Sequence, residues 1–171
     1  MAPRSAPDDA ASEQSLSAMT GQPRRDSFSA FYLREMPLQV RRATLLVGDR
    51  DTARDLVHDA FADVLVRYEQ LRDPGPYLNT VILNKCRDHA RATKRQHPLG
   101  RNPVADTDTR PEHEELWDAL QALPFNHRAV LVLRFHHQMT DREIADTLGC
   151  RIGSVGPWIQ RGLRRLGKDL Q

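Results

Sequence analysis

Apolar residues recur at three- and four-residue intervals along most of the chain, a spacing typical of helices that bury one face. The apolar run 129–135 would fit a strand in isolation, but its length up to His137 and its helical neighbours favour a buried helix. Pro37 is expected to kink or split the first helix. The fold class is therefore all-α. The expected helices cover about residues 28–47, 52–72, 77–95, 111–123, 125–137, 140–148 and 152–170.

Local signals mark several helix ends. Thr52 to Asp55 and Thr140 to Glu143 have the capping-box pattern of a helix N-terminus. Gly48 and Gly149 are placed as C-caps. The Asp-Pro-Gly-Pro segment 73–76 predicts a rigid loop before the third helix.

Two segments lack an apolar period. Residues 1–27, rich in Ala, Ser, Pro and charge, predict a disordered tail, and residues 97–111 predict a flexible linker. The chain then divides into two small helical domains, one at 28–96 and one at 112–171.

The composition limits the compartment and the chemistry. No window of the 171 residues approaches the roughly 18 apolar residues of a membrane span, and no secretory signal is present, so a cytoplasmic protein is expected. Cys86 and Cys150 form no CxxC pair, which agrees with a reducing compartment. Neither His136-His137 nor Cys86 with His89 closes a four-ligand zinc site. No metal and no cofactor are expected.

Charge is distributed unevenly. Residues 76–97 carry five basic side chains against one acidic side chain, and residues 151–171 repeat this balance. Between them, residues 103–118 carry six acidic side chains against one basic side chain. Such an uneven distribution of charge indicates which binding partners the chain has rather than which fold it adopts. The acidic segment is expected to avoid DNA, because like charge repels phosphate.

Residues 140–166 predict a helix-turn-helix: a short capped helix, a turn containing Gly149, and a longer basic helix. The first helix would brace the second, whose N-terminal side chains can enter a major groove while arginines further along meet phosphates. Taken alone, the pattern also fits a helical hairpin with a solvated basic face.

Three segments together resemble the extracytoplasmic-function (ECF) sigma factors of bacterial RNA polymerase. They are VGDRDTARDLVHDAF (47–61), PYLNTVILNKCRDHAR (76–91) and the segment 123–150. The resemblance covers about residues 28–170. It implies a sigma-two-like bundle of three to four helices and a sigma-four-like helix-turn-helix domain. It also implies a sigma factor that binds core RNA polymerase and directs promoter recognition and transcription initiation at a specific regulon.

The resemblance implies three binding surfaces. The helix at 55–67 corresponds to the surface that docks on the polymerase beta-prime clamp helices, and the beta flap is a further expected contact. Residues carried over for polymerase binding are Asp55, Leu56, His58, Asp59, Phe61, Asp63 and Arg67. Those for minus-ten DNA are Arg72, Tyr77, Asn84, Lys85, Arg87, Asp88 and Arg91. Those for minus-thirty-five DNA are Arg151, Ser154, Trp158, Arg161 and Arg165.

The minus-ten residues have a physical task. Opening promoter DNA costs stacking and pairing energy, so a protein without ATP recovers it by capturing exposed bases and phosphates. Asn84 can hydrogen-bond a base edge, while Lys85, Arg87 and Arg91 can follow phosphates of duplex and single-stranded DNA. Only Tyr77 supplies a nearby ring, which predicts weak melting and strict promoter requirements.

The minus-thirty-five segment departs from the family pattern. Family members carry Lys or Arg, then Ser, then a basic or polar residue after the Val of the recognition helix. This chain has Gly156-Pro157-Trp158. A proline inside a helix costs about 3 kcal/mol, which favours a helix that starts late, at Gly156. Trp158 would then lie near the DNA or against the brace helix.

Other classes of function stay open. A stand-alone helix-turn-helix regulator would bind duplex DNA without polymerase, and a sigma-like interaction protein would bind polymerase without initiating. No Gly-rich phosphate loop, nucleophile elbow or convergent carboxylate pair is present, so an enzyme is not expected. An anti-sigma factor is the regulator that the family resemblance implies.

Overall fold

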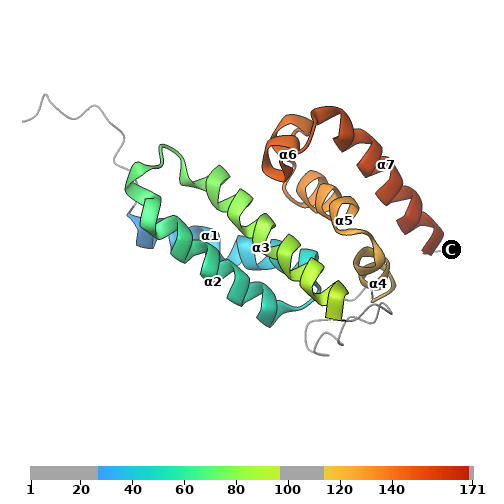
Figure 1. Ribbon diagram of the computed structural model, residues 1–171, viewed down its shortest axis with the longest axis horizontal. Coiled ribbons are helices and arrows are strands. Elements are labelled where there is room, and N and C mark those ends of the chain that lie inside the picture. The colour runs from blue at the N-terminus through green and yellow to red at the C-terminus, as the bar shows by residue number, and fades with distance from the viewer. Residues whose placement is uncertain (1–26, 97–113, 170–171) are drawn as a thin grey trace, which may run out of the picture.

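The computed structural model describes residues 27–96 and 114–169, and all regular structure in these two ranges is helical. The first half contains α1 (Phe28–Val47), α2 (Arg50–Arg67), a 3-10 turn η1 (Tyr68–Gln70) and α3 (Pro74–Gln96). The second contains α4 (Glu114–Ala122), α5 (Phe125–Leu131), a π-helical continuation η3 (Val132–His136), α6 (Asp141–Leu148) and α7 (Ile152–Asp169) (Figure 1). The all-α fold class is confirmed. The tail expected at 1–27, except Ser27, and the linker expected at 97–111 lie outside the described residues.

The junction between α1 and α2 depends on two adjacent residues. Gly48 has a left-handed φ of 89°, and its N–H donates to the Thr44 carbonyl at 2.8 Å, so α1 ends there as predicted. Asp49 is the N-cap of α2, because its carboxylate accepts a 2.6 Å hydrogen bond from the Thr52 N–H. The capping box predicted at Thr52 and Asp55 is therefore wrong, and α2 begins two residues earlier.

Two prolines are accommodated inside helices. Pro37 does not split α1, which continues through it. Because proline has no N–H, the carbonyl of Leu33 lacks its usual helical hydrogen bond. Leu33 is 72% exposed, so water can donate a hydrogen bond to that oxygen. Pro74 stands at the start of α3 and not in a loop, since a first-turn proline lacks only an N–H that has no helical partner. The loop predicted at 73–76 is thus mostly helix.

The second half forms the predicted helix-turn-helix from α6 and α7. The Glu143 N–H donates to Thr140 Oγ1 at 3.3 Å, and the Thr140 N–H donates to Glu143 Oε2 at 2.8 Å, so this capping box is confirmed. Gly149 ends α6 with a φ of 64°. The apolar run 129–135 is helical, as favoured over a strand.

The recognition helix α7 begins at Ile152, so the late start at Gly156 is wrong, and Pro157 lies within the helix. Ile152 and Leu163 fit the apolar spacing of α7, yet they are 56% and 46% exposed. A Cβ on Gly162 would lie 3.0 Å from the side chain of Leu131, the last residue of α5, so α5 and α7 approach closely at this glycine. That close approach sets the inward face of α7 along Val155 and Gly162.

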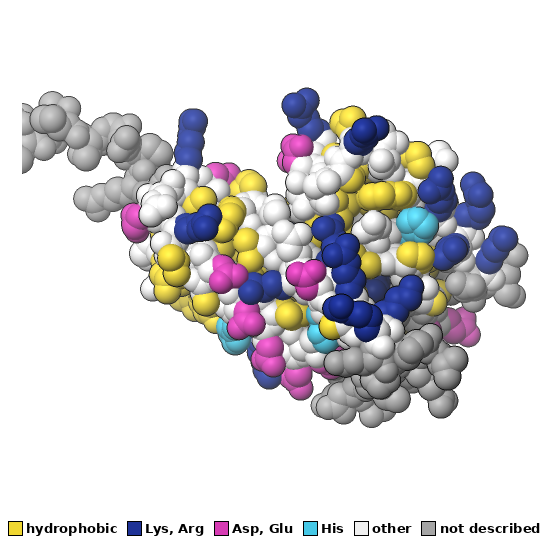
Figure 2. Space-filling model, viewed as in Figure 1, with side chains coloured by type: hydrophobic (Ala, Val, Ile, Leu, Met, Phe, Trp, Pro, Cys, Tyr) yellow, Lys and Arg dark blue, Asp and Glu magenta, His cyan; other side chains and the backbone are white. Residues whose placement is uncertain are grey.

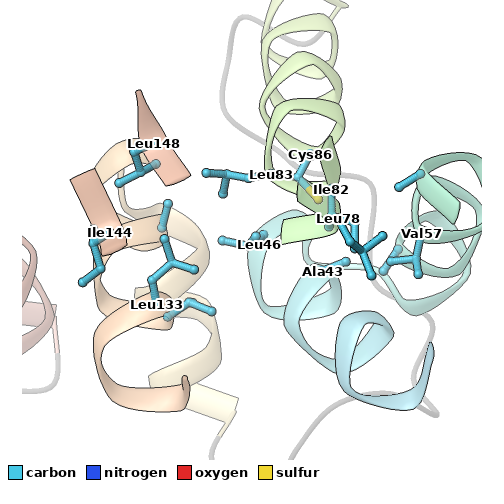
Figure 3. Close-up of a cluster of buried hydrophobic side chains, with 14 of the residues drawn as sticks. Ala43, Leu46, Val57, Leu78, Ile82, Leu83, Cys86, Leu133, Ile144 and Leu148 are labelled. Carbon is cyan, nitrogen blue, oxygen red and sulfur yellow. The ribbon is translucent and has the colours of Figure 1, made fainter. Parts of the chain in front are cut away.

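One buried cluster joins the two halves. In the first half, T-shaped ring pairs connect α1, α2 and η1, as between Phe28 and Tyr68. Leu46 and Leu83 reach from the first half toward the buried Leu133 and Leu148 of the second (Figure 3). Helix α1 packs against α4, α5 and η3, while α3 packs against α6. Nothing in the apolar pattern of the chain indicated that the two halves would share a core.

Candidate nucleic-acid and polymerase-binding surfaces

Helix α2 presents a polar outer face. Asp55, His58, Asp59, Asp63 and Arg67 are all exposed on it. The Asp63 carboxylate forms a 3.0 Å ion pair with Lys85 of α3, so it is engaged within the protein. His58 Nε2 lies 2.9 Å from the Tyr32 hydroxyl, and the two rings stack. Asp55 and Asp59 therefore offer the most accessible negative charge on this face.

The apolar residues of α2 are arranged differently from the sequence-based expectation. Phe61 is 2% exposed and packs among the rings of Phe31 and Tyr32, so in this structure it supports the helix and cannot touch a partner. Leu56 is only partly buried. Leu65 and Val66 were missed: they are 54% and 80% exposed. The spacing of Leu65, four residues after the buried Phe61, is the spacing of a buried position, so periodicity alone does not reveal its exposure.

Helix α3 distributes its predicted minus-ten residues over three sides. Asn84, Asp88 and Arg91 are exposed on its open face, since residues four and three apart share one side of a helix. Tyr77 is partly buried at the start of the helix and packs against the core. Lys85 points to α2, where it pairs with Asp63. The loop residue Arg72 is exposed.

The third side of α3 faces the second half of the molecule. Arg87 Nη2 donates to the Leu148 carbonyl at 3.1 Å, and its guanidinium lies 5.9 Å from the centroid of the Phe125 ring. Its Nη1 also donates to Asn84 Oδ1 at 3.4 Å. Arg87 is thus the one predicted minus-ten residue that the second half holds directly.

A hollow of about 180 Å³ opens beside the start of α3. It is lined by aromatic and charged side chains and by the first residues of α3. Its lining residues are Phe31, Arg34, Glu35, Tyr68, Leu71, Asp73, Pro74 and Gly75. The sequence pattern could not reveal it, because α1, η1 and the loop come together only in the folded chain.

The first turns of α7 carry few polar side chains. Arg151 is exposed just before the helix, and Ser154 is partly buried. Trp158 is partly buried and packs against the core cluster. Pro157 is exposed, and a Cβ added at Gly156 would meet no heavy atom within 4 Å.

Further along α7, basic side chains gather around a second hollow of about 290 Å³. Figure 2 shows Lys and Arg side chains concentrated over this helix at the right-hand side of the molecule. The hollow is lined by His127, Arg161, Arg164, Arg165 and Lys168, which we call the α7 basic cluster. Arg161 and Arg165 belong to the residues predicted for minus-thirty-five DNA; Arg164 and Lys168 were counted only in the basic segment 151–171, and His127 was not predicted.

Buried cations connect the two halves. Arg42 is 4% exposed; its Nη1 donates to Asn79 Oδ1 at 2.6 Å, and its Nε donates to His137 Nε2 at 2.6 Å. Burial lowers the pKa of Arg42 to about 10. Burial and the nearby Arg42 charge lower the pKa of His137 to about 3, so this imidazole stays neutral.

Arg128 and Cys86 complete this buried region. Arg128 is 6% exposed and donates to the carbonyl and side-chain oxygens of Gln121. Gln121 in turn donates to the Leu45 carbonyl of α1 at 3.0 Å. Burial raises the pKa of the Cys86 thiol to about 12, so this cysteine is an unreactive core residue.

Within residues 27–96 and 114–169, no group of three or more His, Cys, Asp or Glu side chains is placed to hold a metal ion. In the same ranges, no helix is long and apolar enough to span a membrane.

The fold and its charged helices define a two-part helical protein that presents a helix-turn-helix. Residues 31–96 match sigma-70 region 2, and residues 113–166 match sigma-70 region 4. The chain is 33% identical to the RNA polymerase sigma-E factor of Streptomyces coelicolor over 139 residues, which cover 77% of this chain and 78% of that protein. It is 34% identical to the sigma-E factor of Streptomyces antibioticus over 134 residues, 74% of each chain.

Solved structures share the fold. The sigma factor RpoE in complex with the anti-sigma factor NepR from Bartonella quintana superposes with a TM-score of 0.70 at 21% identity, covering 84% of this chain and 96% of that one. CnrH in complex with the cytosolic domain of CnrY gives a TM-score of 0.65 at 24% identity, covering 84% and 86%. The chain belongs to the sigma-70 family, as an RNA polymerase sigma factor of the ECF type.

Proposed function

We propose that this sigma factor divides its work between the two halves: residues 28–96 bind core polymerase and minus-ten DNA, and residues 112–171 bind minus-thirty-five DNA. The observation that supports this division best is the placement of its charges. Helix α2 exposes four aspartates together with three arginines, whereas the exposed charged side chains of α3 and α7 are mostly basic. Mostly basic helices suit a polyanion such as DNA, and the mixed charge of α2 suits a protein surface.

The polymerase surface is the outer face of α2. Asp55 and Asp59 supply charge, His58 and Arg67 flank them, and the exposed Leu65 and Val66 add apolar area. The beta-prime clamp helices are the proposed partner of this face, and the beta flap is the proposed partner of the second half. Phe61 stabilises the helix from below rather than touching polymerase.

The minus-ten surface is the open side of α3. Asn84 would hydrogen-bond a base edge, and Arg91 would contact phosphate. The 180 Å³ hollow between Phe31 and Gly75 lies at the start of this helix, where an unstacked base could be received. Arg87 can join this surface only when its contact with Leu148 is broken.

The protein would act in the cytoplasm, where polymerase and chromosome meet, and would not itself be an enzyme. An anti-sigma factor is the proposed regulator. The sigma factor RpoE was solved with the anti-sigma factor NepR, and CnrH was solved with the cytosolic domain of CnrY; both RpoE and CnrH share this fold.

Binding of core RNA polymerase from the same bacterium tests the α2 assignment. Asp59→Arg reverses an exposed charge and is expected to weaken the complex about tenfold, the loss of one favourable charge contact worth about 1.4 kcal/mol. Asp146→Arg, on the exposed side of α6, is the matched control. Equal affinity of the two variants for core polymerase would refute the assignment, provided that circular dichroism shows both to be folded.

A further inference from the structure

One hydrogen bond between the two halves of the molecule depends on a proton. It lies at the junction of the two halves, the contact surface between residues 27–96 and residues 114–169. There Arg42 Nε of α1 donates to His137 Nε2, and Arg42 Nη2 lies 2.6 Å from His137 Nδ1. A neutral imidazole has one nitrogen that can accept a hydrogen bond, and a protonated imidazole has none. The contact therefore requires an unprotonated His137.

Arg42 is held in the first half independently of His137. It is 4% exposed, and its Nη1 donates to Asn79 Oδ1 of α3 at 2.6 Å. The same Asn79 oxygen accepts a 3.1 Å hydrogen bond from Gln39. Burial lowers the pKa of Arg42 to about 10, so its guanidinium stays charged at neutral and acidic pH. A protonated His137 would thus meet a fixed positive charge.

The other charges that act near this ring are also positive. His136 precedes His137, and its Nδ1 lies 3.1 Å from His137 Nε2. Arg41 of α1 is exposed, and its charge acts on His136 together with that of Arg42. A proton on His137 would therefore add repulsion as well as remove the acceptor.

Helices α1, α5 and α6 pack against η3, yet their carboxylates are engaged elsewhere. Glu35 of α1 accepts a hydrogen bond from Gln39, and Asp141 of α6 pairs with Arg134. Arg128 of α5 is buried and adds another cation. Only positive groups, Arg42 and His136, act on the charge of His137. No carboxylate of the described residues is placed to stabilise its protonated form.

The other side-chain hydrogen bonds that cross the junction among the described residues end on main-chain oxygens. Arg87 Nη2 donates to the Leu148 carbonyl at 3.1 Å, and Gln121 Nε2 donates to the Leu45 carbonyl at 3.0 Å. A main-chain carbonyl accepts a hydrogen bond at any pH. Of these contacts, only the one made by His137 is lost when its acceptor takes up a proton.

We propose that the Arg42–His137 contact is a proton-sensitive latch, which keeps the two halves packed at neutral pH and releases them when His137 is protonated. Separation of the halves would also break the contact of Arg87 with Leu148 and free this arginine for DNA. That last consequence rests on the proposed function of α3, whereas the latch itself does not. Acidification would then regulate access to the minus-ten surface.

The direction and size of the effect follow from proton linkage. In the packed molecule, burial and the charges of Arg42 and His136 lower the pKa of His137 to about 3, against an ordinary value of 6.5. Between these pH values the separated state binds one more proton than the packed state, so the packed state loses stability as the pH falls. From pH 7.5 to pH 5.0, the ratio of separated to packed molecules should rise about 30-fold.

The test counts packed and separated molecules of the full chain by single-molecule fluorescence energy transfer. Dyes are attached to cysteines introduced at Gln70 and Gln160, which are exposed on η1 and α7, in a Cys150→Ser background. Cys86 is buried and its thiol is unreactive, so it stays. The labelled chain should show the 30-fold rise between pH 7.5 and pH 5.0, and an unchanged ratio would overturn the latch.

Two substitutions change His137 in opposite directions. His137→Gln keeps an acceptor at every pH, so its ratio of separated to packed molecules should stay nearly constant. His137→Lys carries a charge at pH 7.5 and should raise the ratio there by up to about 3000-fold, the factor for complete protonation. The matched control is His89→Gln, because His89 contacts Thr93 within α3, and this variant should respond like the labelled chain.

An equal acid response in His137→Gln and the labelled chain would overturn the latch, provided that circular dichroism shows both to be helical. Binding of single-stranded DNA oligonucleotides of random sequence tests the consequence for α3 separately. The affinity of the labelled chain should rise at pH 5.0 more than that of His137→Gln. If the halves separate without this difference in affinity, the assignment of α3 to minus-ten DNA fails and the latch stands.

Discussion

Arg87 Nη2 of α3 donates a 3.1 Å hydrogen bond to the main-chain oxygen of Leu148, the last residue of α6. This contact joins the proposed minus-ten helix to α6, the helix that braces the proposed minus-thirty-five reader α7. The same guanidinium cannot hold phosphate and the Leu148 carbonyl in one geometry. In this structure Arg87 therefore holds the two halves together, a state we call the closed arrangement. Arg87 can contact DNA only if the two halves separate.

Loss of this contact should loosen the closed arrangement. Arg87→Ala removes a charged hydrogen bond worth about 1.5 kcal/mol and the contact with the Phe125 ring. Small-angle X-ray scattering of the variant should give a larger radius of gyration than the wild type. Arg91→Ala is the control, because Arg91 is exposed on α3 and pairs only with Asp88 among the described residues. Superimposable curves for Arg87→Ala and wild type would count against the closed state in solution.

The acid stability of the junction depends on His137. In the folded protein the pKa of His137 is about 3, below the ordinary value of 6.5. Between these two pH values the unfolded chain binds a proton at His137 and the folded chain does not. Stability should therefore decline as the pH falls from about 6.5 toward 3. His137→Asn should flatten that decline in urea titrations at several pH values. If the free energy of unfolding of the wild type rose as the pH fell from about 6.5 to 3, the neutral state of His137 would be contradicted.

The groups around His137 support this direction. Arg42 donates to its ring at 2.6 Å, and His136 Nδ1 lies 3.1 Å from its Nε2. Burial and the charges of Arg41 and Arg42 also lower the pKa of His136. Protonation of either ring would add positive charge beside a buried guanidinium, which is unfavourable.

The sequence predicted local features well where the signal and its partner lie within a few residues. The Thr140–Glu143 capping box and the Gly48 C-cap are of this kind. Lys85 and Arg87 show the limit of such reasoning. As members of one basic segment they were assigned to DNA together, yet a two-residue separation turns them to opposite sides of α3. Their partners, Asp63 and Leu148, are visible only in the folded chain.

Packing between distant segments explains the other differences. The close approach of Gly162 to Leu131 fixes the rotation of α7 and leaves Leu163 exposed. The periodicity of α7 alone could not distinguish Leu163 from its buried neighbours. His127 entered no sequence-based list because only the contact of α5 with α7 brings it to Arg161 and Arg165.

The capping box of α6 should contribute measurably to folding. Thr140→Ala removes the hydroxyl that accepts the Glu143 N–H, and loss of an N-cap costs about 1 kcal/mol. The midpoint of thermal unfolding should fall by a few degrees. Thr140→Ser retains the hydroxyl and should remain close to wild type. A Thr140→Ala midpoint equal to that of Thr140→Ser would show that the cap contributes nothing.

Gly156 and Pro157 stand where the family resemblance predicts a Lys or Arg followed by Ser. Because α7 already begins at Ile152, Gly156→Lys with Pro157→Ser would not lengthen the helix. It would restore one main-chain donor and remove a proline cost of up to about 3 kcal/mol. A Cβ at Gly156 meets no heavy atom within 4 Å, so the new lysine has room.

The added lysine should raise the affinity of holoenzyme for DNA and increase its salt slope by about one unit. New side chains in the groove should also alter the minus-thirty-five preference. The minus-ten preference, proposed to depend on Asn84, should stay the same. Transcription from a promoter library randomised at both elements measures the two preferences together. Identical minus-thirty-five profiles for the double variant and the wild type would mean that residues 156 and 157 do not face the bases.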